Sequence, residues 1–329
     1  MSQKLSIGPS LAQSIFLQAC PSNTFLEEMQ EVVPWERIET FLNKEIPSKT
    51  GGRPAYSLLL LYKMHLLQTW YGLSDAGCEF QVKDRFSFRL FLGLEIQDKV
   101  PDASTLEDFR HKLARNGLAE ELLAEMDRYF QEKKLILKEG NLVDATFLKA
   151  NARKIKEEEE KTDVDAEFGH KGYGYSAHTN VDQESKFIRK VATTAANVPD
   201  SEGLEPALVG DEKKVYGDKG YDQPEPRKML KKKNIKARIL WKRKRGKKGE
   251  GPKPLSKRKA FLNKAYSKLR ARVEHVFGIW KTVFKATQAR YRGLERVNQQ
   301  FQTLAMAYNL RRLGYLTKRK PQQAQPQCV

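Results

Sequence analysis

The sequence predicts an all-helical N-terminal part followed by an α/β domain with a mixed sheet and flanking helices. Up to about residue 133, apolar residues recur with the spacing of helices. Beyond it, short apolar runs typical of strands alternate with helical stretches and turn signals. The predicted organisation is an N-terminal extension at 1–50, a helical domain at 51–133, an α/β domain at 134–315 and a disordered tail at 316–329.

Glycine, proline and capping residues divide the helical part. The Gly-Gly-Arg-Pro segment at 51–54 precedes a strongly apolar helix, which Gly72 ends. Ser74 can cap the next helix, and Ser104 with Glu107 has the spacing of a capping box. A helix-turn-helix DNA reader is one interpretation of this part, and an ordinary helical hairpin is the other. The predicted helices are 24–31, 35–44, 55–71, 74–83, 85–93, 106–115 and 118–133.

The α/β part is predicted from apolar runs and the turns between them. From residue 142 the predicted order is β, β, β, α, β, α, β, α, which is the order of a ribonuclease-H-like domain. The segment 182–185 provides the turn of a hairpin. The predicted strands are 135–137, 142–148, 172–181, 186–194, 215–218 and 235–241, and the predicted helices are 203–209, one from Pro224, and 269–277.

The composition indicates a polyanionic partner. The chain has 60 Lys and Arg against 41 Asp and Glu, a formal net charge of +19. Such an excess is typical of proteins that bind nucleic acid or an anionic membrane. No run approaches the roughly 18 apolar residues of a membrane span, and the N-terminus has no signal-peptide pattern. We therefore expect a cytoplasmic protein that binds DNA or RNA and has no membrane partner.

Three carboxylates occupy unusual settings. Asp144 lies inside an apolar run, Asp218 ends another, and Glu274 lies on an amphipathic helix. A carboxylate in an otherwise buried element is costly unless it is paired or binds a cation. The cysteines and histidines show no zinc-ligand spacing, so oxygen ligands and hence Mg²⁺ or Mn²⁺ are favoured. These features suggest a metal-dependent enzyme that acts on a polyanion.

The region around Glu274 is basic. At about 100° per residue, Arg270, Glu274 and Lys281 share a stripe beside the apolar face of their helix. An ordinary surface ion pair between Arg270 and Glu274 is the alternative. Just upstream, 11 of the 18 residues from Lys231 to Lys248 are Lys or Arg. Contacts to phosphates are one interpretation of this run, and a solvated charge run is the other.

Together these motifs resemble the DDE transposases of bacterial insertion sequences, in particular the insertion-sequence-five group. Arg270, Glu274 and Lys281 keep the spacing of the family's catalytic helix. Asp144 in Val-Asp-Ala-Thr resembles the first family aspartate, and Asp218 in Gly-Asp-Lys-Gly-Tyr the second. Motifs around 73–75 and 101–110 resemble the group's N-terminal domain, so the resemblance spans about residues 50 to 315.

Three positions depart from the family pattern. Ser176 stands where the family has a lysine, and Pro199 stands where it usually has a histidine. Tyr266 lies one residue farther from Arg270 than the family's tyrosine does. These departures bear on how active the enzyme is.

The resemblance implies a transposase with a ribonuclease-H-like core. It would cleave DNA at inverted-repeat ends and transfer the freed strand into target DNA, as a homodimer on double-stranded DNA near the bacterial nucleoid. Asp144, Asp218 and Glu274 would be the catalytic residues and the ligands of two Mg²⁺ or Mn²⁺ ions. The DNA-binding candidates are Lys219, Lys242, Arg243, Lys244, Arg245, Arg270, Lys281, Arg290 and Arg292.

Two other functions fit the same residues. A metal-dependent nuclease of the same fold would cleave DNA without strand transfer. A domesticated transposase would bind DNA without catalysis. The three carboxylates argue against the second of these functions, whereas Ser176 and Pro199 leave room for reduced activity.

Overall fold

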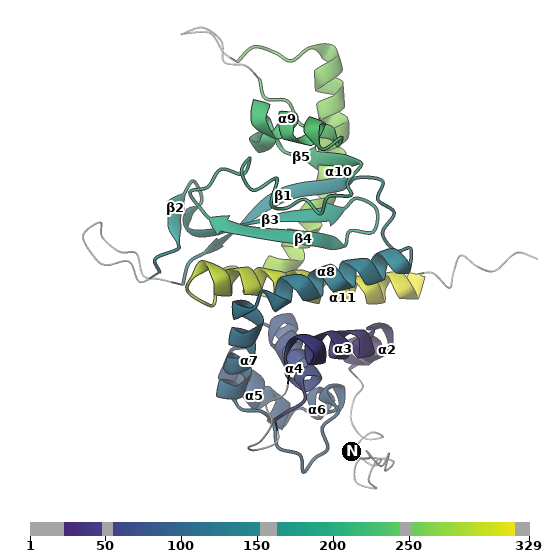
Figure 1. The fold of residues 1–329 in the computed structure, drawn as a ribbon, viewed down its shortest axis with the longest axis vertical. Helices are drawn as coiled ribbons and strands as arrows, with labels where there is room; N and C mark the ends of the chain where they lie inside the picture. The colour runs from purple at the N-terminus through teal and green to yellow at the C-terminus, as the bar shows by residue number, and fades with distance from the viewer. Residues whose placement is uncertain (1–22, 48–54, 152–162, 244–251, 320–329) are drawn as a thin grey trace, which may run out of the picture. The chain divides into compact units, whose positions relative to one another are not determined.

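The computed structural model describes residues 23–47, 55–151, 163–243 and 252–319, which divide into two compact units (Figure 1). The first unit holds the described residues up to Phe109 together with 313–319. The second runs from Arg110 to Arg312. Within the described residues, no helix is both long and apolar enough to cross a bilayer.

The first unit consists of helices around a central buried one. Every residue of α4 from Leu61 to Trp70 is buried, which accounts for its almost continuous apolar sequence. Ser57 caps α4 by accepting from the backbone N–H of Leu60, and Gly72, with φ of +67°, ends it. Ser74 caps α5 as predicted. The helices of this unit are α2 (Thr24–Val32), α3 (Trp35–Glu45), α4 (Leu58–Tyr71), α5 (Asp75–Asp84), α6 (Phe86–Leu92) and the start of α7 (Ala103–Arg115).

The cap of α7 differs from the prediction. The helix begins at Ala103, so Ser104 lies inside its first turn instead of preceding it. Asp102 is the capping residue, because its Oδ1 accepts from the backbone N–H of Thr105 at 2.8 Å and from the Ser104 hydroxyl at 3.0 Å. The predicted capping box is therefore wrong, since a stronger acceptor stands two residues earlier.

The second unit is built on a mixed sheet. β1 pairs antiparallel with β3 and parallel with β5, and β5 pairs parallel with β6. β3 also pairs antiparallel with β2 and β4. This arrangement confirms the predicted ribonuclease-H-like sheet. The strands are β1 (Asn141–Lys149), β2 (Glu167–Gly169), β3 (Gly172–Asp182), β4 (Ile188–Ala195), β5 (Lys214–Gly217) and β6 (Lys236–Ile239).

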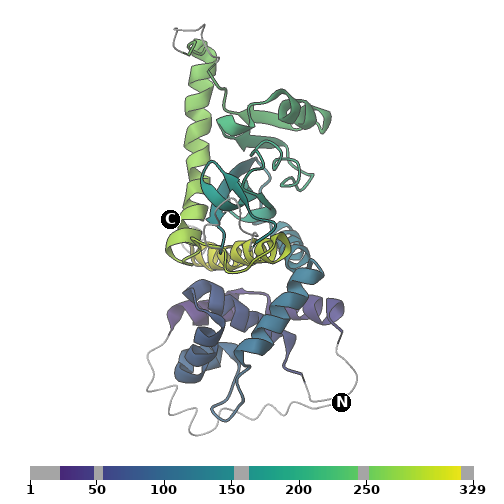
Figure 2. The same ribbon diagram turned by 90° about the vertical axis from the view of Figure 1, so that its left-hand side faces the viewer.

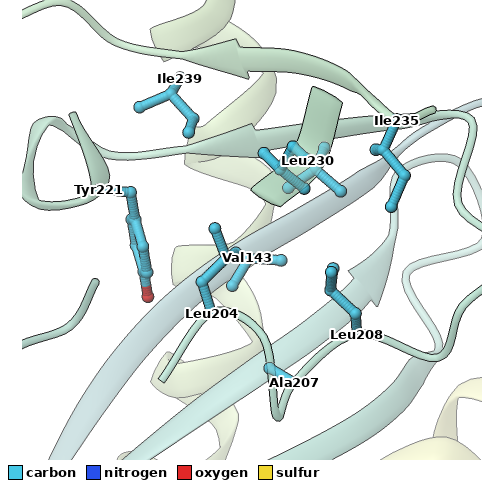
Figure 3. Close-up of a cluster of buried hydrophobic side chains, with 9 residues drawn as sticks. Val143, Leu204, Ala207, Leu208, Tyr221, Leu230, Ile235 and Ile239 are labelled. Atoms are coloured by element: carbon cyan, nitrogen blue, oxygen red, sulfur yellow. The ribbon is translucent and has the colours of Figure 1, made fainter. Parts of the chain in front are cut away.

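Helices cover both faces of this sheet. α9 (Pro224–Lys232) packs on the face that presents Val143, Val215 and Ile239, and encloses a buried apolar cluster (Figure 3). On the other face lies α10 (Lys257–Thr282), one long helix that runs beside the sheet (Figure 2). α10 is thus much longer than the stretch predicted around Glu274.

Two further helices lie along β4. α8 (Leu118–Glu132) packs against β4, and its Phe130 stacks on Phe187 with ring centroids 4.1 Å apart. α11 (Leu294–Arg319) runs along the strand, and its Asn309 side chain bonds both the N–H and the C=O of Ile188. Because α8 belongs with the sheet, the units divide after Phe109, whereas the sequence placed the boundary at 133. Residues 316–319, predicted to begin the tail, continue α11.

Two predicted elements are absent from the described structure. Residues 135–137 form an irregular connection between α8 and β1. Residues 203–209 form turns, because Pro206 lacks a backbone donor and the segment packs tightly against the sheet. A Cβ on Gly203 would lie 2.2 Å from the ring of His178, so only glycine fits there. His178 is accordingly a packed structural residue, bonded through Nε2 to Thr194.

A buried ion pair joins α8 to β4, and breaking it should destabilise the second unit. The Arg189 guanidinium, fully buried, donates twice to Asp127 at 2.9 Å. We expect Asp127→Ala to lower the free energy of unfolding by about 3 kcal/mol, because it leaves a buried charge without one of its partners. Urea denaturation of the full chain measures this change, with the exposed Asp98→Ala as a control. A loss below about 1 kcal/mol would mean that Asp211 alone satisfies Arg189.

Candidate active site

Strand register brings the two aspartates together. Leu142 of β1 pairs with Tyr216 of the parallel strand β5. Two residues further along each strand direction, Asp144 lies opposite Asp218, which directly follows the end of β5. Side chains alternate along a strand, and both aspartates therefore lie on the α10 face of the sheet. Val143 points to the other face, into the cluster of Figure 3.

Arg270 of α10 lies between the two carboxylates. Its Nη2 donates to Asp144 Oδ2 at 2.7 Å, and its Nη1 donates to Asp218 Oδ1 at 3.1 Å. The side chains of Arg270, Asp144 and Asp218 are 15%, 19% and 46% exposed. Arg270 Nε is buried without a hydrogen-bond partner among the described residues. The guanidinium thus offsets one of the two carboxylate charges, and its own hydrogen bonding is incomplete.

Asp144 is in an environment that disfavours its charge. Burial raises the pKa of Asp144, and the nearby Asp218 raises it further, whereas Arg270 and the Ala145 backbone N–H lower it. Tyr221, in the turn after Asp218, is buried beneath the site, and burial holds its pKa well above the ordinary value. Arg270 supplies one positive charge to the two carboxylates, Asp144 and Asp218. A further cation bound beside them would therefore be stabilised by the remaining negative charge.

Glu274 lies one helical turn beyond Arg270 on α10 and is exposed. The sequence allowed an Arg270–Glu274 ion pair, but Arg270 reaches the two aspartates instead. In the part of the chain that is described, no three His, Cys, Asp or Glu side chains gather closely enough to hold a metal ion. The structure thus joins Asp144 and Asp218 and leaves Glu274 on the adjacent surface of α10.

Apart from Arg270, the described DNA-binding candidates fall into four places. Lys219 follows Asp218 directly and Lys281 lies near the end of α10, both exposed. Lys242 and Arg243 are exposed just after β6, whereas Lys244 and Arg245 lie outside the described residues. The loop between α10 and α11, with Arg290 and Arg292, runs beside the far end of β1, where Arg292 donates to the Asn151 carbonyl at 3.3 Å.

Aromatic residues fix the start of the basic segment to α10. Trp241 stacks on Tyr266, and its backbone bonds the Asn263 side chain in both directions. Arg238 donates to the Tyr266 hydroxyl at 2.8 Å. Tyr266 is 7% exposed. Tyr266 therefore has a structural role. Its position in the sequence, one residue farther from Arg270 than the family's tyrosine, is consistent with that role.

The sequence prediction missed part of the basic surface. The first half of α10 exposes a series of cations that extends the run after β6, and Phe261 lies among them at 72% exposure. The high density of Lys in this stretch of the sequence could have predicted this part of the basic surface. The exposed cations of this half are Lys257, Arg258, Lys259, Lys264 and Lys268.

Comparison with known proteins identifies the family. A model of the transposase DDE domain matches residues 136–310, more than half of the chain. The chain belongs to the DDE transposase family. A second model, described as a transposase domain, matches residues 14–112 of this transposase.

Two solved transposase structures are similar at a distance. One is a piggyBac transposase synaptic complex with hairpin DNA, with 12% identity over 93% of this chain and 75% of the other, at a TM-score of 0.43. The other is the Mos1 mariner paired end complex with Mn, with 11% identity over 86% and 94%, at a TM-score of 0.18.

Proposed function

We propose that this transposase cleaves DNA at the ends of its element and transfers the freed 3′ strand into target DNA, with Asp144, Asp218 and Glu274 as ligands of divalent cations. The observation that carries the proposal is the pair of aspartates on one face of the sheet, already sharing one positive group. Family membership supports transposition, and the adjacent carboxylates support the proposed location of its chemistry.

The residues fit a divalent cation. Carboxylate oxygens are the ligands that Mg²⁺ and Mn²⁺ prefer. Asp144 and Asp218 are adjacent, and burial makes the charge on Asp144 unfavourable without a counter-ion. Glu274 is one turn from Arg270 on the same helix, and it would join them when DNA and metal bind. Bound metal would activate an attacking oxygen and stabilise the leaving one.

The basic residues nearby would hold the DNA. Lys219 directly follows Asp218, and Lys281 lies seven residues after Glu274; both are exposed and suited to contacting phosphates. Arg270 can turn from the aspartates to a phosphate, since it carries donors that are not all used. These residues would orient the strand, because phosphodiester transfer depends on in-line placement of the attacking and leaving oxygens.

A strand-transfer assay tests this function. The full chain is incubated with Mg²⁺, a labelled duplex that carries the element's end, and a supercoiled plasmid as target. We expect labelled, joined product. Cleavage without joining would instead favour the nuclease, and binding without either would favour a non-catalytic DNA-binding protein.

DNA affinity should fall steeply with salt concentration. Each phosphate contact releases condensed counterions, and losing one contact reduces the salt slope by about one. We expect the double variant Lys242→Gln, Arg243→Gln to reduce the slope by about two, measured by fluorescence anisotropy on a random duplex. The exposed pair Lys99→Gln, Lys213→Gln serves as the charge-matched control. If both double variants give the wild-type slope, the segment after β6 does not contact DNA.

Recognition of the element's ends should reside in the first unit. α5 exposes Phe80 and Lys83, and the exposed Arg85 follows the helix, so this surface suits a DNA groove. We expect Lys83→Gln with Arg85→Gln to lower the ratio of end affinity to random-DNA affinity by about tenfold. Competition binding measures that ratio. A ratio that stays at the wild-type value would move end recognition to another surface.

A further inference from the structure

The first half of α10 carries a density of positive charge that disfavours its own helical structure. From Lys257 to Arg272, seven of 16 residues are Lys or Arg and none is Asp or Glu. Cations in the first turn of a helix oppose its dipole, and Lys264 and Lys268 are like charges at i,i+4. Both arrangements cost helix stability unless an anion lies nearby. This half of α10 is therefore suited to a polyanionic partner.

Contacts within the second unit show which side of this half faces the sheet. Tyr266 is buried and stacks against Trp241, and Asn263 bonds the Trp241 backbone. Lys259 lies over the Trp241 ring at 5.9 Å. Arg270 reaches the two aspartates. These side chains mark the side of the helix that is turned to the sheet and to the candidate active site.

The opposite side of the helix carries a separate row of cations around an exposed aromatic ring. At about 100° per residue, Phe261 lies about 180° around the helix from Arg270. Phe261 is 72% exposed, and in Figure 2 the sheet and α9 lie on one side of α10. The residues within about 60° of Phe261 include three lysines and an alanine. We call this exposed set the outer stripe, and it consists of Lys257, Phe261, Lys264, Ala265 and Lys268.

The outer stripe fits the backbone of a DNA duplex. A helix rises by about 1.5 Å per residue, so the stripe extends over roughly 16 Å from Lys257 to Lys268. Phosphates follow one another about every 3.4 Å along each strand of a duplex, so the three lysines can reach phosphates of one duplex. None of the ion pairs among the described residues involves these lysines. Their charges are therefore available to an external polyanion.

We propose that the outer stripe of α10 binds a second DNA duplex, separate from the DNA that reacts at Asp144 and Asp218. Its lysines contact phosphates, and Phe261 packs on the deoxyribose between them. The proposal rests on the proposed function, which places the reacting DNA on the other side of the helix. Contacts to the backbone position a duplex without reading its sequence, so this surface suits DNA of any sequence.

A bridging assay without divalent metal tests the inference separately from catalysis. The full chain is bound to a random duplex tethered to beads, and a labelled duplex of another random sequence is added. We expect the wild type to retain the labelled duplex. The triple variant Lys257→Gln, Lys264→Gln, Lys268→Gln should retain about tenfold less, because three phosphate contacts are lost. Phe261→Ala should lower retention by about threefold, because less apolar surface is buried.

The same triple variant should still bind one duplex, because the DNA contacts near the aspartates remain. Fluorescence anisotropy with a single labelled duplex measures this binding. Two matched variants separate the outer stripe from net charge, and both should retain the labelled duplex as the wild type does. One replaces exposed lysines elsewhere, Lys99→Gln, Lys112→Gln, Lys213→Gln. The other keeps the charge of the stripe, Lys257→Arg, Lys264→Arg, Lys268→Arg.

Three results would overturn the inference. The wild type could bind one duplex and retain no labelled second one. The glutamine variant of the stripe could retain as much labelled duplex as the wild type, which would place bridging on another surface. That variant could also lose its binding to a single duplex, which would make the stripe the main DNA surface and not a second one. A wild-type chain that binds no duplex at all would instead refute the proposed function.

Discussion

Asp144→Asn, Asp218→Asn and Glu274→Gln should each reduce DNA cleavage and strand joining by about 10³-fold or more. Each substitution keeps the size of the side chain but removes a negatively charged oxygen ligand. The effect should be largest at Asp144, which is the most enclosed of the three and directly faces Asp218. Cleavage of a labelled duplex carrying the element's end, in Mg²⁺ or Mn²⁺, measures the rates.

Folding and DNA binding should survive these substitutions. The DNA contacts lie on Lys and Arg side chains elsewhere, and the loss of negative charge favours a polyanion. Asp165→Asn is a matched control, since Asp165 is exposed and bonds the Leu294 N–H away from the aspartate pair. Ca²⁺ should support binding with little turnover, because its looser coordination does not hold in-line geometry. A near wild-type rate for any of the three variants would show that this residue is not a metal ligand.

The sequence was sufficient to predict the sheet and the position of the aspartates on it. The apolar run around Asp144 and the short run ending at Asp218 both appear as strands in the structure. Their pairing follows from the order of elements, because parallel neighbours meet with their carboxyl ends at one edge. Local sequence and topology therefore contained the information that brings Asp144 to Asp218.

What the sequence did not reveal depends on long-range packing. Asp102 rather than Ser104 caps α7 because two acceptors compete within three residues, and only the exact helix start decides between them. The 203–209 segment has helical spacing in the sequence. In the structure it forms turns, because Gly203 packs directly against the ring of His178. Arg270 could be assigned only to a neighbour on its own helix, since nothing local shows that the sheet presents it with two carboxylates.

Arg270→Gln should raise the affinity of the metal-free protein for Mn²⁺ by about tenfold. The guanidinium and a divalent cation compete for the same oxygens of Asp144 and Asp218, so removing the guanidinium removes that competition. Without metal the variant should be less stable than the wild type, because two adjacent and partly buried carboxylates lose their counter-ion. Added Mn²⁺ should accordingly raise the melting temperature more in the variant than in the wild type.

The same variant should cleave DNA about 10²-fold more slowly, because Arg270 would no longer be available to hold a phosphate near the reacting bond. Tighter metal binding combined with slower cleavage separates this arrangement from a purely structural ion pair, which would change stability alone. Arg272→Gln is the matched control, since Arg272 lies on the same helix but contacts the Gln183 carbonyl and Glu184. Calorimetric titration of each variant with Mn²⁺ measures whether Arg270 competes with the metal for the aspartate oxygens. If Arg270→Gln and Arg272→Gln bind Mn²⁺ with the same affinity as the wild type, Arg270 does not compete with metal and the cations bind at other oxygens.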